Sequence, residues 1–585
     1  MVQKKELWLP VNLADLFYTS AERFADNEAL KYKVGHHYER LTYFELRQEV
    51  IKLAIALGKL GLKTGDKAIL FSENRPEWVI TDLALISLGV VNIPVHSVLS
   101  PFQLETIIKE IKPEVIFFSD HELGTKFLDI AGTIAKIAYL ISFEKLDMED
   151  FHHLVYFKDL VDGSSISGRG EAELLELALR VKPESVATII YTSGTTGHFK
   201  GVQLTHKNIL SNVLAVINCV WVYPEDRFFS ILPLSHIFER TIGYYIPLYA
   251  GASVGYVTDL KNVSQEIKER QPTIVIAVPR LFEKIYEKIL DNVEKSIFKK
   301  IIFRFAFSLK KDGQHKTLEK FFENLVFTKV RAEFGGEIRF FVSGGAALPA
   351  KLGRFFEQVG LIILEGYGLT ETAPVISCNR LKDYSFGTVG PVLEGVEVKF
   401  SSSGEIVVKG PSVTPGYIRK EDTKEAFTHD GWFKTGDYGY FDRKGFLVLT
   451  GRKKDLIVLS TGKKVAPTLV EEQLEFSLYI DQAFVFGDAR KHIGAIIVPN
   501  FEKMKEKFGL KGLHHLAKDD KVREFLNEEI KELLKNYASY EKIYKFIIQP
   551  EPFSIENGEL TPKLGLRRHV IYERNLEEIE KLYQK

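Results

Sequence analysis

Short runs of β-branched and apolar residues alternate with helical patterns over residues 40–180. Lys67–Phe71 and Val90–Val95 are two such runs, and between them Ser72 is expected to open a helix with Pro76 in its first turns. Strand–helix–strand units of this kind favour a parallel sheet that is covered by helices. The pattern therefore predicts an α/β fold. Further strands are expected at 113–118, 185–191, 227–232, 253–257, 273–278, 338–342 and 361–364.

The 585-residue chain is too long for one hydrophobic core, so we expect several units. A large N-terminal domain of helix-covered sheets is expected at 1–453. From about Gly395 the segments become short β runs with glycine turns, which is typical of a small β-barrel-like subdomain at about 385–450. The charged run Gly451–Asp455 marks a boundary, and 454–585 has the length of one small α+β C-terminal domain. Its expected elements are a helix at 467–476 and strands at 482–486 and 494–498.

The charge and the cysteine content indicate which partners and which cellular compartment to expect. The chain has 78 basic and 78 acidic side chains, so its net charge gives no reason to expect a nucleic-acid partner. Two cysteines, Cys219 and Cys378, are too few for a disulfide framework and fit a reducing compartment. The N-terminus lacks the apolar core of a signal peptide, and the longest apolar run, near Leu83–Val95, is interrupted by Ser, Gly, Asn and Pro. We therefore expect a cytoplasmic protein without a membrane-spanning helix.

A loop rich in glycine and hydroxyl residues, Tyr191–Gly201, follows the strand expected at 185–191. Beyond the loop, Thr205 is expected to cap a helix whose apolar positions fall on one face. Glycine lets backbone N–H groups converge on an anion, while hydroxyls and the Lys200 ammonium add further donors. The spacing differs from a Walker A motif, in which four residues separate the first Gly from Gly-Lys-Ser/Thr. Taken alone, the loop predicts either a polyphosphate cradle or an ordinary turn.

Further motifs follow this loop along the chain. They are Leu232–Arg240 (Leu-Pro-Leu-Ser-His-Ile-Phe-Glu-Arg), Tyr367–Thr372 (Tyr-Gly-Leu-Thr-Glu-Thr), Gly431–Asp437 (Gly-Trp-Phe-Lys-Thr-Gly-Asp) and Gly451–Asp455 (Gly-Arg-Lys-Lys-Asp). Together with the glycine loop they resemble the motifs of the adenylate-forming superfamily of acyl-CoA synthetases, luciferases and peptide-synthetase adenylation domains. Leu232–Arg240, the helical residues 281–334 and Ser343–Pro349 most resemble the long-chain fatty acid–CoA ligases. The similarity covers nearly the whole chain.

The resemblance implies an ATP-dependent fatty acid–CoA ligase. A thiol cannot attack a carboxylate at useful rates, because the leaving group would be oxide. Transfer to the α-phosphate of ATP makes an acyl adenylate and pyrophosphate, and CoA then displaces AMP to give acyl-CoA. ATP, Mg²⁺, a long-chain fatty acid and CoA as co-substrate are therefore expected. Two alternatives stay open, namely transfer of the acyl group to a carrier protein or another acceptor, and a low-turnover acyl- or nucleotide-binding protein.

The same resemblance assigns residues to the metal and the phosphates. Glu371 would bind Mg²⁺, since hard oxygen ligands suit that ion, and the metal would neutralise charge on the α-phosphoryl group. Thr370 would donate its hydroxyl to that phosphate. Thr370, Glu371 and Arg452 are therefore the expected catalytic residues. The β- and γ-phosphates would be held by Thr192, Ser193, Gly194, Thr195, Thr196, Gly197 and Lys200.

Nucleoside and acyl contacts are implied in the same way. Asp437 would accept both ribose hydroxyls and Arg452 would bind the ribose from the other side, although an aspartate beside glycine also forms turns. His236 and Phe238 would form the wall on the acyl side, although a lone histidine is usually structural. Adenine contacts are assigned to Gly344, Gly345 and Ala346, which are small enough to let a ligand approach the backbone, and to Gly366, Tyr367 and Gly368, of which Tyr367 would stack on or flank adenine.

One C-terminal loop departs from the family pattern. Long-chain enzymes typically read Leu-Thr-Pro-Thr-Leu-Lys there, and this chain reads Leu560-Thr-Pro-Lys-Leu-Gly. Gly565 therefore occupies the position of the lysine that reaches the α-phosphate, and Lys563 stands two residues earlier. In an extended segment, residues two apart share a face but lie about 7 Å apart. We expect adenylation to be slowed about 10²–10³-fold and thioester formation to be largely spared.

In the resembled family the C-terminal domain swings about a hinge, which here matches Lys454–Asp455. Residues 299–311 are basic and aromatic, so they either contact a membrane surface peripherally or pack their aromatic rings against the protein. The oligomeric state stays open, a homodimer included.

Overall fold

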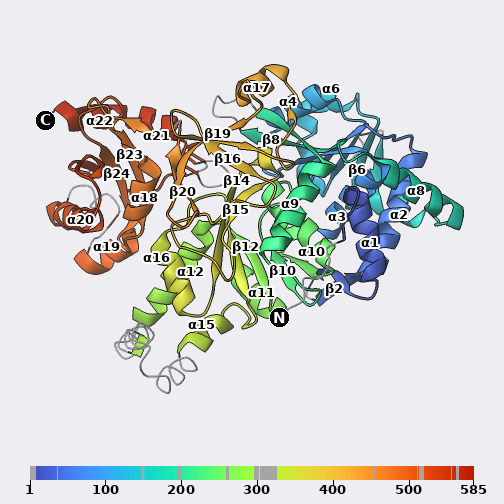
Figure 1. Cartoon of the computed structure of the whole chain (residues 1–585), viewed down its shortest axis with the longest axis horizontal. Helices are drawn as coiled ribbons and strands as arrows, with labels where there is room; N and C mark the ends of the chain where they lie inside the picture. Colours follow the sequence, from blue (N-terminus) through green and yellow to red (C-terminus); the bar gives the residue numbers. More distant parts are fainter. Residues whose placement is uncertain are drawn as a thin grey trace. The chain divides into compact units, whose positions relative to one another are not determined.

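The computed structural model describes residues 8–35, 37–146, 151, 153–193, 199–257, 262–294, 302–303, 326–453, 455–509, 512, 519–554, 556–560 and 565–584. The chain divides into two compact units (Figure 1). The N-terminal unit comprises Met1–Val398, Val408–Lys434 and Gly445–Leu447. The C-terminal unit comprises Lys399–Val407, Thr435–Lys444 and Val448–Lys585.

One eight-stranded sheet of the N-terminal unit has the order β18-β9-β8-β4-β3-β5-β6-β7. Its strands are β3 (Lys67–Phe71), β4 (Val91–Val95), β5 (Val115–Phe118), β6 (Tyr139–Ser142), β7 (Leu154–Tyr156), β8 (Val186–Ser193), β9 (Phe199–Thr205) and β18 (Gly416–Tyr417). Strands β3 to β6 pair in parallel, as the strand–helix alternation predicted. Ile69 of β3 and Phe118 of β5 contribute to a buried core cluster against this sheet, together with Ile107 of helix α4 (Pro101–Ile111).

A second eight-stranded sheet has the order β15-β14-β13-β12-β10-β11-β1-β2. Its strands are β1 (Glu28–Val34), β2 (His37–Thr42), β10 (Arg227–Ser230), β11 (Ser253–Tyr256), β12 (Ile274–Ala277), β13 (Phe340–Ser343), β14 (Ile363–Gly368) and β15 (Val375–Cys378). Strands β10 to β14 pair in parallel, which confirms the strands predicted between 227 and 364. Strand β14 extends to Gly368, beyond the end predicted at residue 364, because β15 pairs with it in an antiparallel register.

Helices α1 (Leu13–Arg23), α2 (Tyr43–Lys59), α3 (Pro76–Leu88) and α8 (Gly168–Arg180) pack together beside the first sheet (Figure 1). Helix α3 begins at Pro76 and not at the predicted Ser72, since the residue before a proline avoids the helical region and Arg75 is extended. Among the described residues, this unit also contains α5 (His121–Thr125), α6 (Ala131–Ile134), α7 (Phe157–Asp162), α9 (His206–Cys219), α10 (Ile246–Ala250), α11 (Val263–Arg270), α12 (Pro279–Glu294), α15 (Thr328–Ala332), α16 (Ala350–Gln358) and α17 (Lys420–Ala426).

The helical stretch predicted at 281–334 is confirmed at its two ends by α12 and α15. Residues 295–301 and 304–325 lie outside the described residues, and with them lies nearly all of the basic, aromatic stretch 299–311. Within the described ranges, no helix combines the length and the apolar character that crossing a bilayer requires.

Short strands separated by glycine turns follow Gly395, as predicted. They are β16 (Glu397–Phe400), β17 (Glu405–Lys409), β19 (Phe433–Phe441) and β20 (Leu447–Arg452), and they form a sheet in the order β16-β17-β19-β20. Gly404 and Gly445 have φ angles of +88° and +82°. This left-handed region strongly favours glycine, which explains why the turns carry it.

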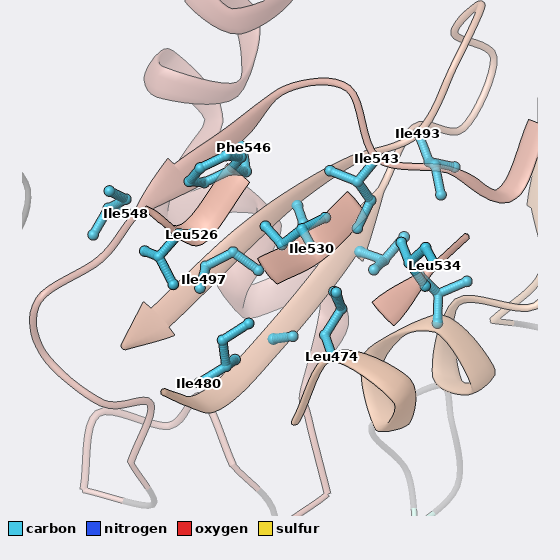
Figure 2. Packing of buried hydrophobic residues seen from close by; sticks show 14 of the residues in the cluster. Leu474, Ile480, Ile493, Ile497, Leu526, Ile530, Leu534, Ile543, Phe546 and Ile548 are labelled. Carbon is cyan, nitrogen blue, oxygen red and sulfur yellow. The ribbon is translucent and has the colours of Figure 1, made fainter. Parts of the chain in front are cut away.

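The C-terminal unit has an α+β core of its own. Helix α18 (Pro467–Glu475) and strands β23 (Ile480–Phe486) and β24 (Gly494–Pro499) confirm the elements predicted there. Its other elements are β21 (Ile457–Val458), β22 (Lys464–Val465), β25 (Phe546–Ile548), α19 (Phe501–Phe508), α20 (Asp520–Leu533), α21 (Arg568–Arg574) and α22 (Leu576–Gln584). Figure 2 shows Leu474 of α18, Ile497 of β24 and Ile530 of α20 within the buried cluster that joins the helices to the sheet.

Candidate active site

The glycine loop is the turn of a β-hairpin. Strand β9 pairs back on β8 in an antiparallel register that sets Lys200 opposite Thr192. A strand that was not expected from the sequence therefore lies between the glycine loop and the helix, because buried Val202 and Leu204 alternate with half-buried Gln203. Lys200 thus projects from a strand and not from a flexible loop. Gly194, Thr195, Thr196 and Gly197 lie outside the described residues, and of Ser193 only the backbone is described.

Helix α9 begins after this strand, and its predicted cap is confirmed. The Thr205 hydroxyl accepts a hydrogen bond from the Asn208 N–H, and the Asn208 side chain accepts one from the Thr205 N–H. The same Asn208 side chain donates to the carbonyls of Pro411 and Val413, at 2.8 and 2.9 Å. The cap of α9 therefore also anchors a segment that lies some two hundred positions later in the sequence.

Lys200 is half-buried within a charged and aromatic environment. Its Nζ lies 2.7 Å from Asp422 Oδ1, and the two side chains are only 25% and 19% exposed. The same Nζ lies 5.5 Å from the ring centroid of Tyr417. Lys200 is therefore not a freely solvated surface lysine.

Glu371 lies at the end of β14, in the short 3-10 helix Thr370–Thr372. The Tyr417 hydroxyl donates to Glu371 Oε1 at 2.7 Å, and the Thr414 N–H donates to the Glu371 carbonyl at 2.8 Å. Burial, and then the neighbouring carboxylate, raise the pKa of the Tyr417 hydroxyl, so it stays a proton donor. Thr370 is half-buried beside Glu371. Tyr417 thus joins the environments of Lys200 and Glu371, two residues that the sequence assigned to one triphosphate site.

The loop after β13 is held tightly against its surroundings. A Cβ placed on Gly344 would lie 2.7 Å from the ring carbon Cζ of Phe238, and Gly345 has a φ of +84°. The buried Glu365 carboxyl accepts a hydrogen bond from the Leu348 N–H at 2.9 Å, and burial raises the pKa of Glu365 to about 8. An alanine at position 344 would therefore require the Phe238 ring to shift, and this close contact brings a predicted adenine-loop residue and a predicted acyl-wall residue together. Ala346 follows in the same loop.

Strand β14 carries the other predicted adenine residues. A Cβ on Gly368 would lie 1.8 Å from the Pro374 carbonyl oxygen, so this position also requires glycine. Tyr367 is buried, with its backbone opposite Ser377 of β15. Gly366 pairs with Cys378 in the same register.

An apolar cavity of about 40 Å³ lies in the N-terminal unit beside Phe238. Its lining comes from α9, the π-helix Glu239–Tyr245 and the second sheet, and consists of Val216, Val220, Val222, Phe228, Phe238, Ile242, Ile246, Ile274, Phe340, Val342, Leu364, Val375, Cys378 and Asn379. His236 lies near His96 instead, with the rings 5.5 Å apart at 71°. Of the two residues predicted for the acyl wall, only Phe238 contributes to this lining.

Asp437 and Arg452, the residues predicted for the ribose, lie together in the C-terminal unit. Arg452 Nε is 3.2 Å from Asp437 Oδ1, and Asp437 is 5% exposed. Asp437 lies within strand β19 and not in the turn that an aspartate beside glycine can also form, although Gly436 before it has a φ of +74°. The nearly buried carboxylate and the largely exposed guanidinium therefore form an ion pair at the surface of this unit.

The C-terminal loop that departs from the family's sequence pattern is described only in part. Leu560 and Leu566 form an isolated β-bridge, Gly565 is exposed, and Lys563 lies outside the described residues. Arg568, which follows, forms an ion pair with the buried Glu471 and lies 3.8 Å from Asp455 Oδ1.

Residues that sequence reasoning missed surround the predicted ones. Tyr417, Asp422 and Glu365 each contact a predicted site residue or the loop that carries it. Tyr417 follows Pro-Gly in a segment without helical or strand periodicity, so its local sequence indicated only a turn. In the sequence, Tyr417 was indicated only by a glycine followed by an aromatic residue shortly before a charged helix.

Comparisons with known proteins show which family the chain resembles. The AMP-binding enzyme family model matches residues 17–418, and the model of the AMP-binding enzyme C-terminal domain matches residues 454–585. A long-chain-fatty-acid–CoA ligase of Mycobacterium bovis is 34% identical over 565 residues, which is 93% of this chain and 92% of that protein. A chloroplastic long-chain-fatty-acid–[acyl-carrier-protein] ligase of Arabidopsis thaliana is 28% identical and covers 97% of this chain and 86% of that protein.

The fold is shared with solved adenylate-forming enzymes. The crystal structure of the anthranilate CoA ligase AuaEII, in complex with anthranoyl-AMP, superposes with a TM-score of 0.75 at 20% identity. The match covers 97% of this chain and 98% of that one.

Proposed function

The chain belongs to the AMP-binding enzyme family, and from this we propose that it activates a long-chain fatty acid with ATP and transfers the acyl group to CoA. The first step gives an acyl adenylate and pyrophosphate, and the second gives acyl-CoA and AMP. The similarity to a long-chain-fatty-acid–CoA ligase over 93% of the chain supports this substrate class. The observation that carries the proposal is the grouping of Lys200, Tyr417 and Glu371 beside the β8–β9 hairpin.

Each residue of this group has a separate task. Lys200 and the hydroxyl residues of the hairpin bind the β- and γ-phosphates, since an ammonium and several donors suit a polyphosphate. Thr370 donates its hydroxyl to the α-phosphate, where charge develops when the carboxylate attacks. AMP then leaves more readily than oxide would, which is what makes attack by the CoA thiol feasible.

The residues present fit a magnesium ion. Mg²⁺ is usually bound by one or two carboxylates together with substrate phosphates and water, and not by an all-protein cage. Among the described residues, no group of three or more His, Cys, Asp or Glu side chains forms such a cage. Glu371 supplies a carboxylate beside the proposed phosphate site, so we assign it as the protein ligand. Bound there, the ion would neutralise charge on the α-phosphoryl group.

The nucleoside and acyl contacts follow the same assignment. The Gly344–Ala346 loop and Tyr367 flank adenine, while Asp437 and Arg452 bind the ribose hydroxyls. The acyl chain enters the apolar cavity beside Phe238. A cavity needs about 10–15 Å³ for each water molecule, so about 40 Å³ is too small for a long chain, and side chains of the lining must move on binding.

We propose that 454–585 is the domain that supplies a different set of contacts to each half-reaction, with its hinge at Lys454–Asp455. The match of the C-terminal family model to 454–585 and the separate hydrophobic core of this region support that role. Motion about such a boundary needs only a few backbone changes.

Because Gly565 occupies the position of the family's lysine, adenylation is the half-reaction to test. Without the family's lysine we expect pyrophosphate release from fatty acid and ATP to be slowed about 10²–10³-fold, while CoA transfer from supplied acyl adenylate is largely spared. If Lys563 takes over the role, Lys563→Ala slows pyrophosphate release further. A normal rate in that variant would show that Lys563 has no such role.

The decisive experiment is an ATP- and CoA-dependent thioester assay with a series of saturated fatty acids. We expect turnover with long chains and AMP as the nucleotide product. Absence of both acyl adenylate and thioester, with nucleotide binding intact, would favour the low-turnover binding protein that Gly565 also suggests.

A second acceptor has a specific observation in its favour. The relative from Arabidopsis thaliana is named as a ligase for acyl carrier protein, and it covers 97% of this chain. Kinetics with CoA against a phosphopantetheinylated carrier protein distinguish the two acceptors. A higher kcat/KM with the carrier would replace CoA as the proposed acceptor.

We propose a cytoplasmic protein with peripheral membrane contact through 299–311, supported by the basic and aromatic composition of that stretch. Sedimentation with anionic liposomes at low salt tests the contact, and light scattering tests for a homodimer.

A further inference from the structure

Residues 411–423, here called the return segment, connect the β8–β9 hairpin with the turn that carries Glu371. Gly416 and Tyr417 pair with Gln203 and Val202 of β9 as strand β18. The Gln203 side chain donates to the Tyr417 carbonyl at 2.9 Å. On the other side, the Thr414 N–H donates to the Glu371 carbonyl at 2.8 Å. The return segment therefore holds the two halves of the proposed triphosphate site in one hydrogen-bonded assembly.

Tyr417 has a fixed orientation within this segment. Its N–H donates to the Thr423 hydroxyl at 2.9 Å, and its hydroxyl donates to Glu371 Oε1 at 2.7 Å. A carboxylate accepts up to about four hydrogen bonds or metal contacts, so one donor leaves it able to bind a cation. The effect of the Tyr417 hydroxyl is thus to fix the direction in which the Glu371 carboxylate points without neutralising its charge.

Asp422 has the opposite relationship to the site. Its carboxylate lies 2.7 Å from Lys200 Nζ. It therefore forms an ion pair with the same ammonium group that the terminal phosphates of ATP require. A carboxylate and a polyphosphate cannot both stay close to one ammonium without repelling each other. Asp422 is therefore a counter-ion of Lys200. It keeps the lysine side chain in place while no phosphate is bound, and the incoming phosphate must replace it.

We propose that Tyr417 and Asp422 are positioning residues of the nucleotide site. Tyr417 orients the Glu371 carboxylate for Mg²⁺, and Asp422 holds Lys200 until the terminal phosphates of ATP displace it. This inference rests on the proposed function, because it takes Lys200 and Glu371 as the phosphate and metal residues. Neither Tyr417 nor Asp422 needs to touch the reacting atoms.

The two positioning roles predict opposite effects on binding. Tyr417→Phe removes a hydrogen bond to a charged group, which weakens ATP binding about tenfold at limiting Mg²⁺ but leaves binding without Mg²⁺ unchanged. Asp422→Asn removes a competing charge, so it strengthens ATP binding about three- to tenfold with or without Mg²⁺, and more at low ionic strength.

Calorimetric titration of the full chain with ATP, at several Mg²⁺ concentrations, tests both roles without relying on turnover. Tyr38→Phe is the matched control for Tyr417→Phe, because the Tyr38 hydroxyl also donates to a carboxylate, Glu269 at 2.7 Å, but does not contact Glu371. Glu421→Gln is the control for Asp422→Asn, since it removes one negative charge from the same helix α17. Both controls should bind ATP like the wild type.

The outcomes separate the inference from the function on which it rests. Equal loss of ATP affinity with and without Mg²⁺ in Tyr417→Phe would overturn the role of Tyr417. Weaker ATP binding by Asp422→Asn would overturn the role of Asp422. If the wild type binds no ATP at any Mg²⁺ concentration, the proposed function itself fails. Thermal denaturation of each variant shows whether a change in affinity arises from partial unfolding.

Discussion

The side-chain amide of Asn212 satisfies both backbone polar groups of Val375. Its Nδ2 donates to the Val375 carbonyl at 2.7 Å, and its Oδ1 accepts from the Val375 N–H at 3.2 Å. Asn212 is fully buried on α9, and Val375 is the first residue of β15. This pair therefore joins the helix to the edge strand along the wall of the apolar cavity, which Val375 also lines.

Replacement of Asn212 by alanine should destabilise the N-terminal unit by about 2–4 kcal/mol, because it leaves a buried N–H and a buried carbonyl without partners. Urea unfolding followed by circular dichroism measures the change. Asn218→Ala, at an exposed position of the same helix, is the matched control and should cost less than about 0.5 kcal/mol. Equal stabilities of the two variants would show that the Val375 backbone finds other partners.

Replacement of Gly344 by alanine should displace the Phe238 ring, because the new Cβ would lie 2.7 Å from its Cζ atom. The ring borders the apolar cavity, so we expect a larger loss of kcat/KM for long-chain than for short-chain fatty acids, about tenfold or more. A chain-length series measures this selectivity. Gly58→Ala, where no atom lies within 4 Å of the added Cβ, should leave the series unchanged.

Glu239 predicts a pH dependence of stability. Full burial raises the pKa of this carboxyl from 4.5 to about 8. Between about pH 5 and 8 the folded chain keeps the proton while the unfolded chain releases it, so this group lowers the free energy of unfolding as pH rises, by about 1.4 kcal/mol per pH unit. Glu239→Gln lacks this titrating carboxyl, so its free energy of unfolding should fall less between about pH 5 and 8.

Urea midpoints at pH 5, 6, 7 and 8 measure the Glu239 effect. The exposed substitution Glu184→Gln is the control and should follow the wild-type trend. Parallel curves for the wild type and Glu239→Gln would contradict a buried, protonated Glu239.

Asp437 predicts selectivity for the ribose. If its carboxylate accepts the ribose hydroxyls, the wild type should bind 2′,3′-dideoxy-ATP about 10–100-fold more weakly than ATP. Asp437→Asn should discriminate less between the two nucleotides, and inorganic tripolyphosphate should bind the variant and the wild type alike. Calorimetry with the three ligands measures these affinities. Unchanged discrimination in the variant would remove Asp437 from the ribose site.

Much of the fold and part of the site were predictable from local patterns. The parallel strands β3 to β6, the cap of α9 at Thr205 and the elements of the C-terminal unit all follow from apolar periodicity and capping chemistry. Boundaries failed where a neighbour decided them, as at Gly368, where pairing with β15 prolongs β14. Strand β9 was not predicted, because its alternation of buried and half-buried residues is short and follows directly after the glycine-rich loop.

The sequence by itself determined the α/β class and the order of motifs that identifies the family, because hydrophobic period, caps and glycine turns act over a few residues. Only the tertiary structure decided that Tyr417 meets Glu371, that Asp422 meets Lys200 and that Phe238 covers Gly344. Such contacts join segments tens to hundreds of positions apart. Burial and backbone pairing of the whole sheet bring them together, and no local pattern in either partner reports the other.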